Sequence, residues 1–187
     1  KSSYNGIGTA FSWYLDIACK HWDALVEGDY NRVMPLPYYK KYNQQHIYIP
    51  YHIKHLGVFS VDKLTPTITE TFIYSIPPRF KTVELSLNTM NKCNPEGYST
   101  KEQLNYQLDL IAPYHTIYDS YSDRVKKDII SSEIESIQVR RIENTAEFVS
   151  FNRFNQPSGK PTSNEIDDLK LESLINILLK YKLCQII

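Results

Sequence analysis

The stretch FSWYLDIACKHWDALVEGDYNRVMPLPYYKKYNQQHIYIPYHIKHLGVFS, residues 11–60, decides the fold and holds most of the candidate ligand contacts. It contains both tryptophans of the chain and about half of its 15 tyrosines. Tryptophan and tyrosine rings combine a large apolar body with a polar tip, so this density suits a wall that packs on one side and contacts a ligand on the other. For each single ring the alternative is an ordinary place in an aromatic core.

The composition bounds the function classes. A chain of 187 residues with 42% hydrophobic content can bury a sizeable core in one or two domains. Lys plus Arg and Asp plus Glu are balanced at 21 each, which argues against a general polyanion binder such as a DNA-binding protein.

Cys19, Cys93 and Cys184 are far apart and form no CxxC pair, so neither a disulfide framework nor a zinc site is predicted. The predicted location is the cytoplasm, since no apolar run reaches the ~18 residues of a membrane span and no signal-peptide pattern occurs.

The residues around this stretch predict a hairpin-rich first half. Gly28 and Asp29 mark the turn of a hairpin, and Thr65 with Pro66 marks the cap and first residue of a helix that Pro77 and Pro78 end. Because proline donates no ladder hydrogen bond, the two prolines of MPLP predict that their strand bulges or leaves the sheet. The predicted elements are a helix over 9–20, strands over 22–29, 30–42 and 44–53, and an extended segment over 56–60.

The second half continues the alternation of strands and helices. A polar segment with Pro95 and Gly97 predicts a surface loop over 90–103, and a proline- and serine-rich segment predicts a linker over 154–167. A strong helix and the beginning of a strand follow from 169. The other predicted elements are strands over 82–88, 104–111 and 137–142, and a helix over 113–137. Together they predict a mixed sheet flanked by helices, of the α/β or α+β class.

Three stretches together resemble the first half of the Fem-type, GNAT-like acyltransferases. They are SWYLDIACKHWDALVEGDYNRVMPLP, IYIPYHIKHLGVFS and NYQLDLIAPYHTIYDSYSDRVKKDI. In that family a helix with an SW-type motif precedes a hairpin that ends in an MPLP-like strand, and a later segment has the form Y-x-L-x-L … Y-x-x-I … S-x-x-x-K-[RK]. The resemblance covers about residues 10–142. The residues in the places of the later segment are Tyr106, Leu108, Leu110, Tyr114, Ile117, Ser122, Lys126 and Lys127.

The resemblance implies two tandem GNAT-like domains. Residues 1–145 would form the first, without its opening strand, and 146–187 would be a linker and the start of a truncated second. It also implies transfer of an acyl or aminoacyl group, from acyl-CoA or aminoacyl-tRNA, to an amine of a cell-wall precursor, lipid or metabolite, with no covalently bound cofactor. The family's pyrophosphate loop, [QR]-x-x-G-x-[GA], has only a weak counterpart in SYNGIG at 3–8. The alternative function is a non-catalytic GNAT-like module that binds a ligand or a protein.

Direct acyl transfer to an amine needs a base that removes a proton and donors that hold the developing oxyanion, whereas the nucleophile belongs to the substrate. No G-x-S-x-G elbow occurs, and no cysteine has a suitable neighbour in sequence, so a hydrolase is disfavoured. The sequence identifies no catalytic residue. Asp16, Glu27 and Asp29 could position an amine, and for each the alternative is a solvated helix or turn carboxylate.

Rings and positive charges occur together in YYKKY at residues 38–42, where a phosphate could be held and a base or sugar stacked; the alternative is a solvated strand end. Arg124, Lys126 and Lys127 make a second basic group, and the resemblance to the Fem-type family implies that an anionic substrate or a tRNA stem could dock there. Interleaved Asp123 and Asp128 weaken its field, so a solvated helix face is the alternative there. The predicted substrate-binding residues are Trp13, Tyr14, Asp16, Tyr38, Tyr39, Lys40, Tyr48 and Tyr51.

Three histidines lie within ten residues, at His46, His52 and His55. On a helix, His52 and His55 would be spaced as two metal ligands. Their segment is predicted to be extended, where residues three apart point to opposite faces. The prediction is therefore surface or partly buried imidazoles and no metal site.

Overall fold

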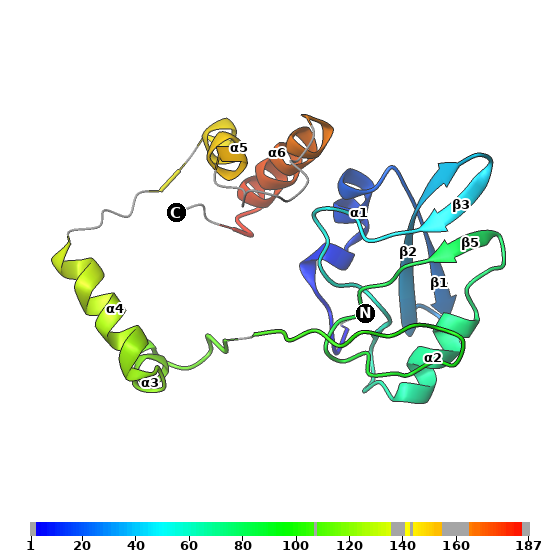
Figure 1. Cartoon of the computed structure of the whole chain (residues 1–187), viewed down its shortest axis with the longest axis horizontal. Coiled ribbons are helices and arrows are strands. Elements are labelled where there is room, and N and C mark those ends of the chain that lie inside the picture. Colours follow the sequence, from blue (N-terminus) through cyan, green and yellow to red (C-terminus); the bar gives the residue numbers. More distant parts are fainter. Residues whose placement is uncertain (1–2, 107, 136–140, 143, 155–164, 185–187) are drawn as a thin grey trace. The chain divides into compact units, whose positions relative to one another are not determined.

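The computed structural model describes residues 3–106, 108–135, 141–142, 144–154 and 165–184. Contacts divide the chain into two compact units, one of Lys1–Lys101 with Asn144–Cys184 and one that takes Glu102–Glu143. The first unit carries a mixed sheet of five strands with helices around it, which is the mixed α/β class predicted (Figure 1). The division into two GNAT-like domains near residue 145 stays a prediction.

The first unit begins with a 3-10 turn and a short helix and continues into the sheet. Its elements are η1 (Gly8–Ala10), α1 (Ser12–Ala18), β1 (His21–Glu27), β2 (Arg32–Lys41), β3 (Gln44–Ile47), β4 (Phe59–Ser60), α2 (Pro66–Tyr74), β5 (Phe80–Val83), α5 (Thr145–Phe154) and α6 (Glu165–Lys180). No described helix has the length and apolar character to cross a membrane.

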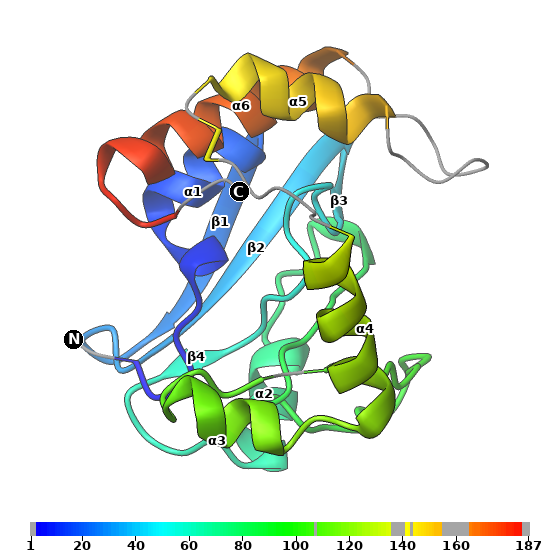
Figure 2. The ribbon, with the colours of Figure 1, turned by 90° about the vertical axis from the view of Figure 1, so that its left-hand side faces the viewer.

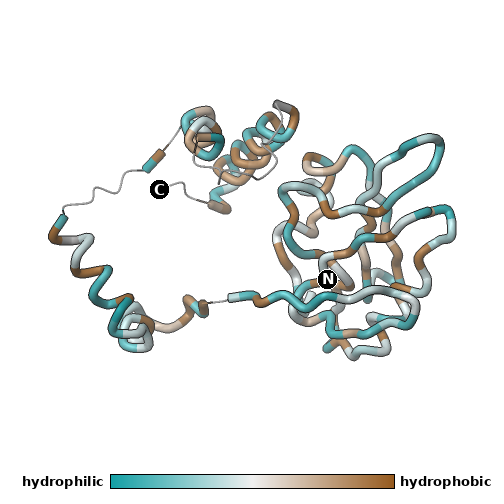
Figure 3. Tube along the Cα trace, viewed as in Figure 1, coloured by the Kyte–Doolittle hydropathy of each residue, from teal (hydrophilic) through white to brown (hydrophobic). Residues whose placement is uncertain are grey.

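The sheet is built from two antiparallel hairpins and one parallel pairing. β1 pairs with β2 along its whole length, and the turn between them contains Gly28 at φ 59°, as predicted. β2 turns into β3 through Tyr42 and Asn43, whose φ values of 49° and 62° are those of a type I′ hairpin turn. After α2 the chain returns as β5, which runs parallel to β3. Figure 3 shows that the β2–β3 hairpin end is hydrophilic.

One strand position of the sheet is interrupted. β3 pairs with β2 at Tyr38–Lys41, and β4 pairs with the same edge of β2 at Arg32 and Val33. Between them residues 48–58 leave the sheet, so Met34–Pro37 have no strand partner on that edge among the described residues. The sheet is therefore open at one place along β2.

The two prolines of β2 explain where the opening falls. The backbone N–H of Tyr48 donates to the carbonyl of Pro37 at 3.2 Å, so Pro37 points its backbone groups away from β1. Because backbone groups alternate along a strand, Pro35 points the same way, and β1 loses no hydrogen bond to either proline. The prediction that the MPLP strand bulges or leaves the sheet is wrong: β2 is continuous, and its neighbour leaves instead.

Opposite faces of the sheet carry two separate cores. On one face Met34, Leu36 and Ile47 pack against Phe72 and Ile73 of α2. The other face has Trp22 packed with Leu15 and Cys19 of the α1 region. Each fully buried aliphatic side chain contributes about 1.5–3 kcal/mol relative to exposure, so both helices are held by the sheet's alternating side chains.

The helix at α1 was predicted over 9–20 and is interrupted at Phe11, whose extended backbone separates η1 from α1. The helix after Thr65 is confirmed, with the Thr65 hydroxyl accepting from the N–H of Ile68 at 3.4 Å. Two predicted strands are shorter or shifted: β3 ends at Ile47 rather than 53, and β5 covers Phe80–Val83 rather than 82–88. Leu87 still forms a parallel bridge with Leu56.

The C-terminal part of the first unit is more helical than predicted. α5 was not predicted, and α6 begins at Glu165, inside the segment predicted as a linker. Residues 155–164 of that linker and the strand predicted at the end of the chain lie outside the described residues. α6 contacts α1, and α5 packs beside α6 (Figure 2).

The second unit consists of α3 (Tyr114–Asp119) and α4 (Asp123–Ile134) after an irregular segment. The strand predicted over 104–111 is wrong for the residues described there, since Leu104 is 88% exposed and Ile111 92% exposed. The predicted helix over 113–137 is two helices, because the Ser122 hydroxyl accepts from the N–H of Val125 and starts a new one. Most of the strand predicted over 137–142 lies outside the described residues.

Candidate functional site

A narrow cleft lies where the strand position beside β2 is interrupted. We call it the edge cleft; its lining comes from Pro35 and Pro37 of β2, from residues 48–50 and 53–57, and from residues 84–86. Its volume is about 10 Å³, which is room for about one water molecule. A substrate would therefore have to open the cleft. Residues 48–55 of its wall lie outside the named strands and are the part that can move, whereas Leu56 is bridged to Leu87.

Two polar side chains of this cleft can carry chemistry. The Nδ1 atom of His55 is buried and has no hydrogen-bond partner among the described residues. Burial raises the pKa of the Tyr48 hydroxyl to about 12, with Cys19 and Asp167 adding to the shift, so this hydroxyl remains a proton donor at neutral pH. A buried imidazole nitrogen without a partner is costly, and among the described residues Nε of Arg32 and Oε1 of Gln45 are the other buried side-chain atoms in this state.

The backbone of the cleft is fixed by a glycine and a buried asparagine. Gly57 has φ +112°, a conformation that L side chains rarely adopt. Next to it, the N–H of Val58 donates to Oδ1 of Asn91 at 2.7 Å, and Nδ2 of Asn91 donates to the carbonyl of Val58 at 3.1 Å. A second buried amide, Asn5, accepts from the N–H of Ser60 at 3.0 Å. These side chains take the place of a neighbouring strand beside residues 58–60.

A polar cluster joins α1, the segment 48–58 and α6. The Tyr14 hydroxyl donates to the carbonyl of His52 at 3.0 Å, and Nε2 of His52 lies 2.8 Å from the carbonyl of Asp167. The ammonium of Lys170 donates to the carbonyl of Ala18 at 3.2 Å, at the C-terminal end of α1 where a positive charge is favourable. Burial raises the pKa of Tyr14, and Cys19 adds to the shift. The cluster thus holds the outer wall of the edge cleft in place.

Cys19 lies within this cluster and is not a nucleophile. Burial raises the pKa of its thiol to about 12, Lys170 lowers it, and Asp16 raises it. At neutral pH the thiol therefore stays protonated, and a protonated, buried thiol is a poor nucleophile. The dismissal of a cysteine nucleophile, made from sequence neighbours, has a physical basis at this residue.

The shift of Cys19 predicts how stability depends on pH. The pKa in the folded state, about 12, is higher than the ordinary value of 9. Between these values the unfolded chain has already lost the proton that the folded chain keeps, so the free energy of unfolding falls as pH rises above 9. In Cys19→Ala the fall in the free energy of unfolding with pH should be shallower by up to about 1.4 kcal/mol per pH unit. Urea unfolding followed at several pH values between 8 and 11 would measure it, and equal slopes in both proteins would contradict the prediction.

Some of the predicted substrate-binding residues lie together. The Tyr39 ring is edge-on to Tyr48 at 5.5 Å and stacks on His46 at 5.0 Å. Burial raises the pKa of both Tyr14 and Tyr48, and Cys19 adds to each shift, so the two hydroxyls flank the same cluster. Tyr51 is exposed and edge-on to His52 at 4.8 Å.

Other predicted residues are placed elsewhere. Tyr38 lies on the α2 face of the sheet, between His21 at 5.4 Å and Phe80 at 5.5 Å. Lys40 alternates to that same face and is exposed, so residues 38–42 do not form one surface. The remaining two residues pair locally: Trp13 stacks with Phe11 at 6.3 Å, and Asp16 accepts from Nε1 of Trp22 at 2.8 Å.

The basic group on α4 belongs to the second unit. Lys126 donates to the carbonyl of Asp119 at 3.0 Å and lies over the Tyr118 ring at 5.7 Å. Arg124 and Lys127 are exposed. His46, His52 and His55 are half-buried, as predicted, and the described part of the chain holds no group of three residues that could bind a metal ion.

Sequence reasoning missed two residues of the site. His55 was predicted to be a surface or partly buried imidazole without a role, and Lys170 fell in a predicted helix without a role. No local pattern marks either one, because each reaches the site through a contact between residues far apart in the chain. Comparisons with protein-family models, with curated proteins and with solved structures find no match.

Proposed function

We propose that this chain is an N-acyltransferase with a GNAT-like sheet, which moves an acyl or aminoacyl group onto an amine acceptor. The observation that carries the proposal is the unpartnered Nδ1 of His55, a residue that lines the edge cleft together with Tyr48. One group can take a proton and the other can donate one, which are the two needs of direct acyl transfer.

The order of the sheet supports a GNAT-like fold. β1, β2 and the interrupted position of β3 and β4 are antiparallel neighbours, and α2 then crosses to β5, which runs parallel to β3. In open α/β sheets ligands bind in the crevice beyond the carboxyl ends of the strands. Residues 48–50 and 84–86, which follow the parallel strands β3 and β5, line the edge cleft.

In the proposed reaction the amine nitrogen attacks the carbonyl carbon of the donor. The C–N bond forms as the thioester C–S bond or the ester C–O bond breaks. Nδ1 of His55 accepts the proton that the nitrogen loses, and the Tyr48 hydroxyl donates a hydrogen bond to the developing oxyanion or to the leaving group. The leaving thiolate or alkoxide takes up a proton. No acyl-enzyme forms, in keeping with the protonated thiol of Cys19.

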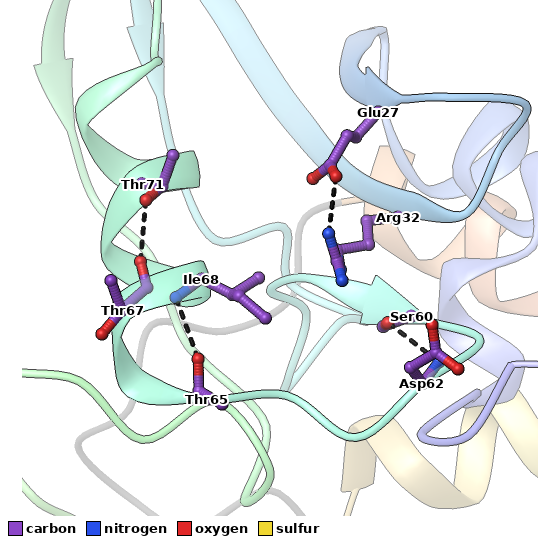
Figure 4. A network of polar contacts seen from close by, with 8 residues as sticks. All are labelled: Glu27, Arg32, Ser60, Asp62, Thr65, Thr67, Ile68 and Thr71. Atoms are coloured by element: carbon purple, nitrogen blue, oxygen red, sulfur yellow. Dashed lines mark hydrogen bonds and ion pairs between the residues drawn. The ribbon is translucent and has the colours of Figure 1, made fainter.

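The junction between β4 and α2 helps to decide which acyl donor the protein would use. In a CoA-dependent enzyme of this type, the pyrophosphate loop would lie between a strand and a helix. Here the Thr65 hydroxyl already accepts the N–H of Ile68 (Figure 4), and Pro66 has no N–H to offer. Nearby, the Ser60 hydroxyl accepts the N–H of Asp62 at 3.1 Å. This favours an aminoacyl-tRNA donor over acyl-CoA, whose pyrophosphate would have to be held elsewhere.

One observation favours the second candidate, a non-catalytic binding module. The edge cleft holds only about 10 Å³, far less than an acyl group and an amine require together. A module of this kind would need no opening of residues 48–58 and no proton acceptor.

A transfer assay distinguishes the two candidates. The protein is incubated with radiolabelled acetyl-CoA or with aminoacyl-tRNA, each with lysyl peptides, aminolipids and polyamines, and amide products are separated by chromatography. We expect an amide with at least one donor and no labelled protein. Absence of product with both donors would overturn the transferase, and labelled protein would overturn direct transfer.

A further inference from the structure

A second cavity lies between α5 and α6, with a volume of about 240 Å³. Ala146, Val149, Ser150 and Arg153 line it from α5 at helical spacing, so they share one face of that helix. Asp168, Leu169 and Glu172 line it from α6. The small side chains of Ala146 and Ser150 leave the space between two helices that otherwise pack side by side (Figure 2).

The charged end of the cavity is held by a fixed ion pair. Asp168 is 5% exposed, and its Oδ2 accepts from Nε of Arg153 at 2.7 Å and from Nη2 of the same residue. The Arg153 side chain is 58% exposed, so the buried carboxylate orients a guanidinium whose remaining N–H groups face outward. Arg153 can thus bind a carboxylate in two-point geometry without losing Asp168.

A second carboxylate stands one helical turn further along α6. Glu172 is half-buried and lines the same cavity, and the described residues include no ion-pair partner for it. Since Asp168 neutralises Arg153, Glu172 gives the cavity a site for a positive group beside the guanidinium. Val149 and the exposed Leu169 add apolar surface to the lining of the cavity.

We propose that this cavity binds a free α-amino acid with an apolar side chain. Its carboxylate lies on Arg153, its ammonium on Glu172, and its side chain against Val149 and Leu169. A zwitterion is the ligand that satisfies a guanidinium and a carboxylate at once, and the volume suits a molecule of the size of leucine or phenylalanine. The inference does not rest on the proposed acyl transfer, because it concerns a separate cavity with its own charges.

The test is calorimetric titration of the whole chain with L-leucine and L-phenylalanine. We expect saturable binding of one of them, with a Kd of about 10 µM to 1 mM. The matched probes isoamylamine and isocaproate, or phenethylamine and 3-phenylpropionate, lack one charge and should bind about tenfold or more weakly, because a charge-assisted hydrogen bond is lost. No binding of either amino acid, or equal binding of the singly charged probes, would overturn the proposal.

Variants locate the site. Glu172→Gln and Arg153→Lys should each weaken binding about tenfold, and Ala146→Leu should abolish it by filling the cavity. Asn176→Ala, an exposed position of α6, is the control and should bind as the unaltered chain does. Far-UV circular dichroism and thermal unfolding confirm that each variant is folded. Unchanged affinity in folded Glu172→Gln and Ala146→Leu would place the amino acid elsewhere and overturn the inference.

Discussion

Gly57→Ala is expected to lower the free energy of unfolding by about 2–4 kcal/mol. The residue has φ +112°, so any side chain there strains the backbone. An added Cβ would also lie 2.8 Å from Oδ1 of Asn91, the atom that accepts the N–H of Val58. To relieve the clash Asn91 would have to move, which would leave the buried N–H and carbonyl of Val58 without these partners. Strain and a lost pair of hydrogen bonds therefore act at the same place.

Urea unfolding followed by circular dichroism measures this effect, and the corresponding fall in Tm is about 5–15 °C. Gly8→Ala is the matched control. A Cβ at Gly8 would meet nothing within 4 Å, and its φ is ordinary, so the free energy of unfolding should stay the same or rise slightly. If both variants lost equal stability, the loss would come from alanine at a glycine position in general and not from the Asn91 contact.

Sequence reasoning succeeded where the signal is local. Adjacent residues predict the turn at Gly28, and Thr65 with Pro66 predicts the start of α2. The structure confirms both. In each case the deciding interaction joins residues at most a few positions apart, so propensity and cap chemistry are enough. The strands of the first hairpin follow from the same local signals.

It failed where the partner is distant. The prolines of β2 predict a defect in their own strand, but their backbone groups face the edge of β2 that residues 48–58 leave without a strand. The alternation of apolar and polar residues over 104–111 indicates which side chains a strand would bury. It does not indicate whether a sheet edge is present for that strand to pair with. Leu104 and Ile111 are exposed because the described second unit contains two helices and no strand.

The candidate site was the hardest part to predict, for the same reason. Tyr14, Tyr39 and Tyr48 were chosen for ring density and do flank one region, whereas Tyr38 and Lys40 fall on the other face through the pleat of β2. His55 could be identified as a cleft residue only once the structure showed that residues 48–58 leave the sheet beside β2. Spacing alone offered it as a metal ligand, because sequence shows how far apart residues are but not which cavity they line.

His55→Gln is expected to lower the rate of acyl transfer by about 10²–10⁴-fold, the usual contribution of a positioned general base. This prediction rests on the proposed function. Glutamine fills much of the same space, and the amide nitrogen or oxygen can still form a hydrogen bond, but it cannot take a proton from the attacking amine. The Tm should change little, because Nδ1 of His55 has no partner among the described residues to lose.

Rates measured against pH separate a base from a structural residue. If His55 accepts the proton, the unaltered protein loses rate on the acid side of its profile, and His55→Gln has a low rate without that limb. His115→Gln, at an exposed position of α3, is the matched histidine control and should keep both the rate and the limb. A His55→Gln protein with the original pH profile and near-original rate would remove His55 from the reaction. His55 lines the edge cleft with a buried nitrogen that has no partner among the described residues, which costs stability, and proton transfer would give this costly arrangement a use.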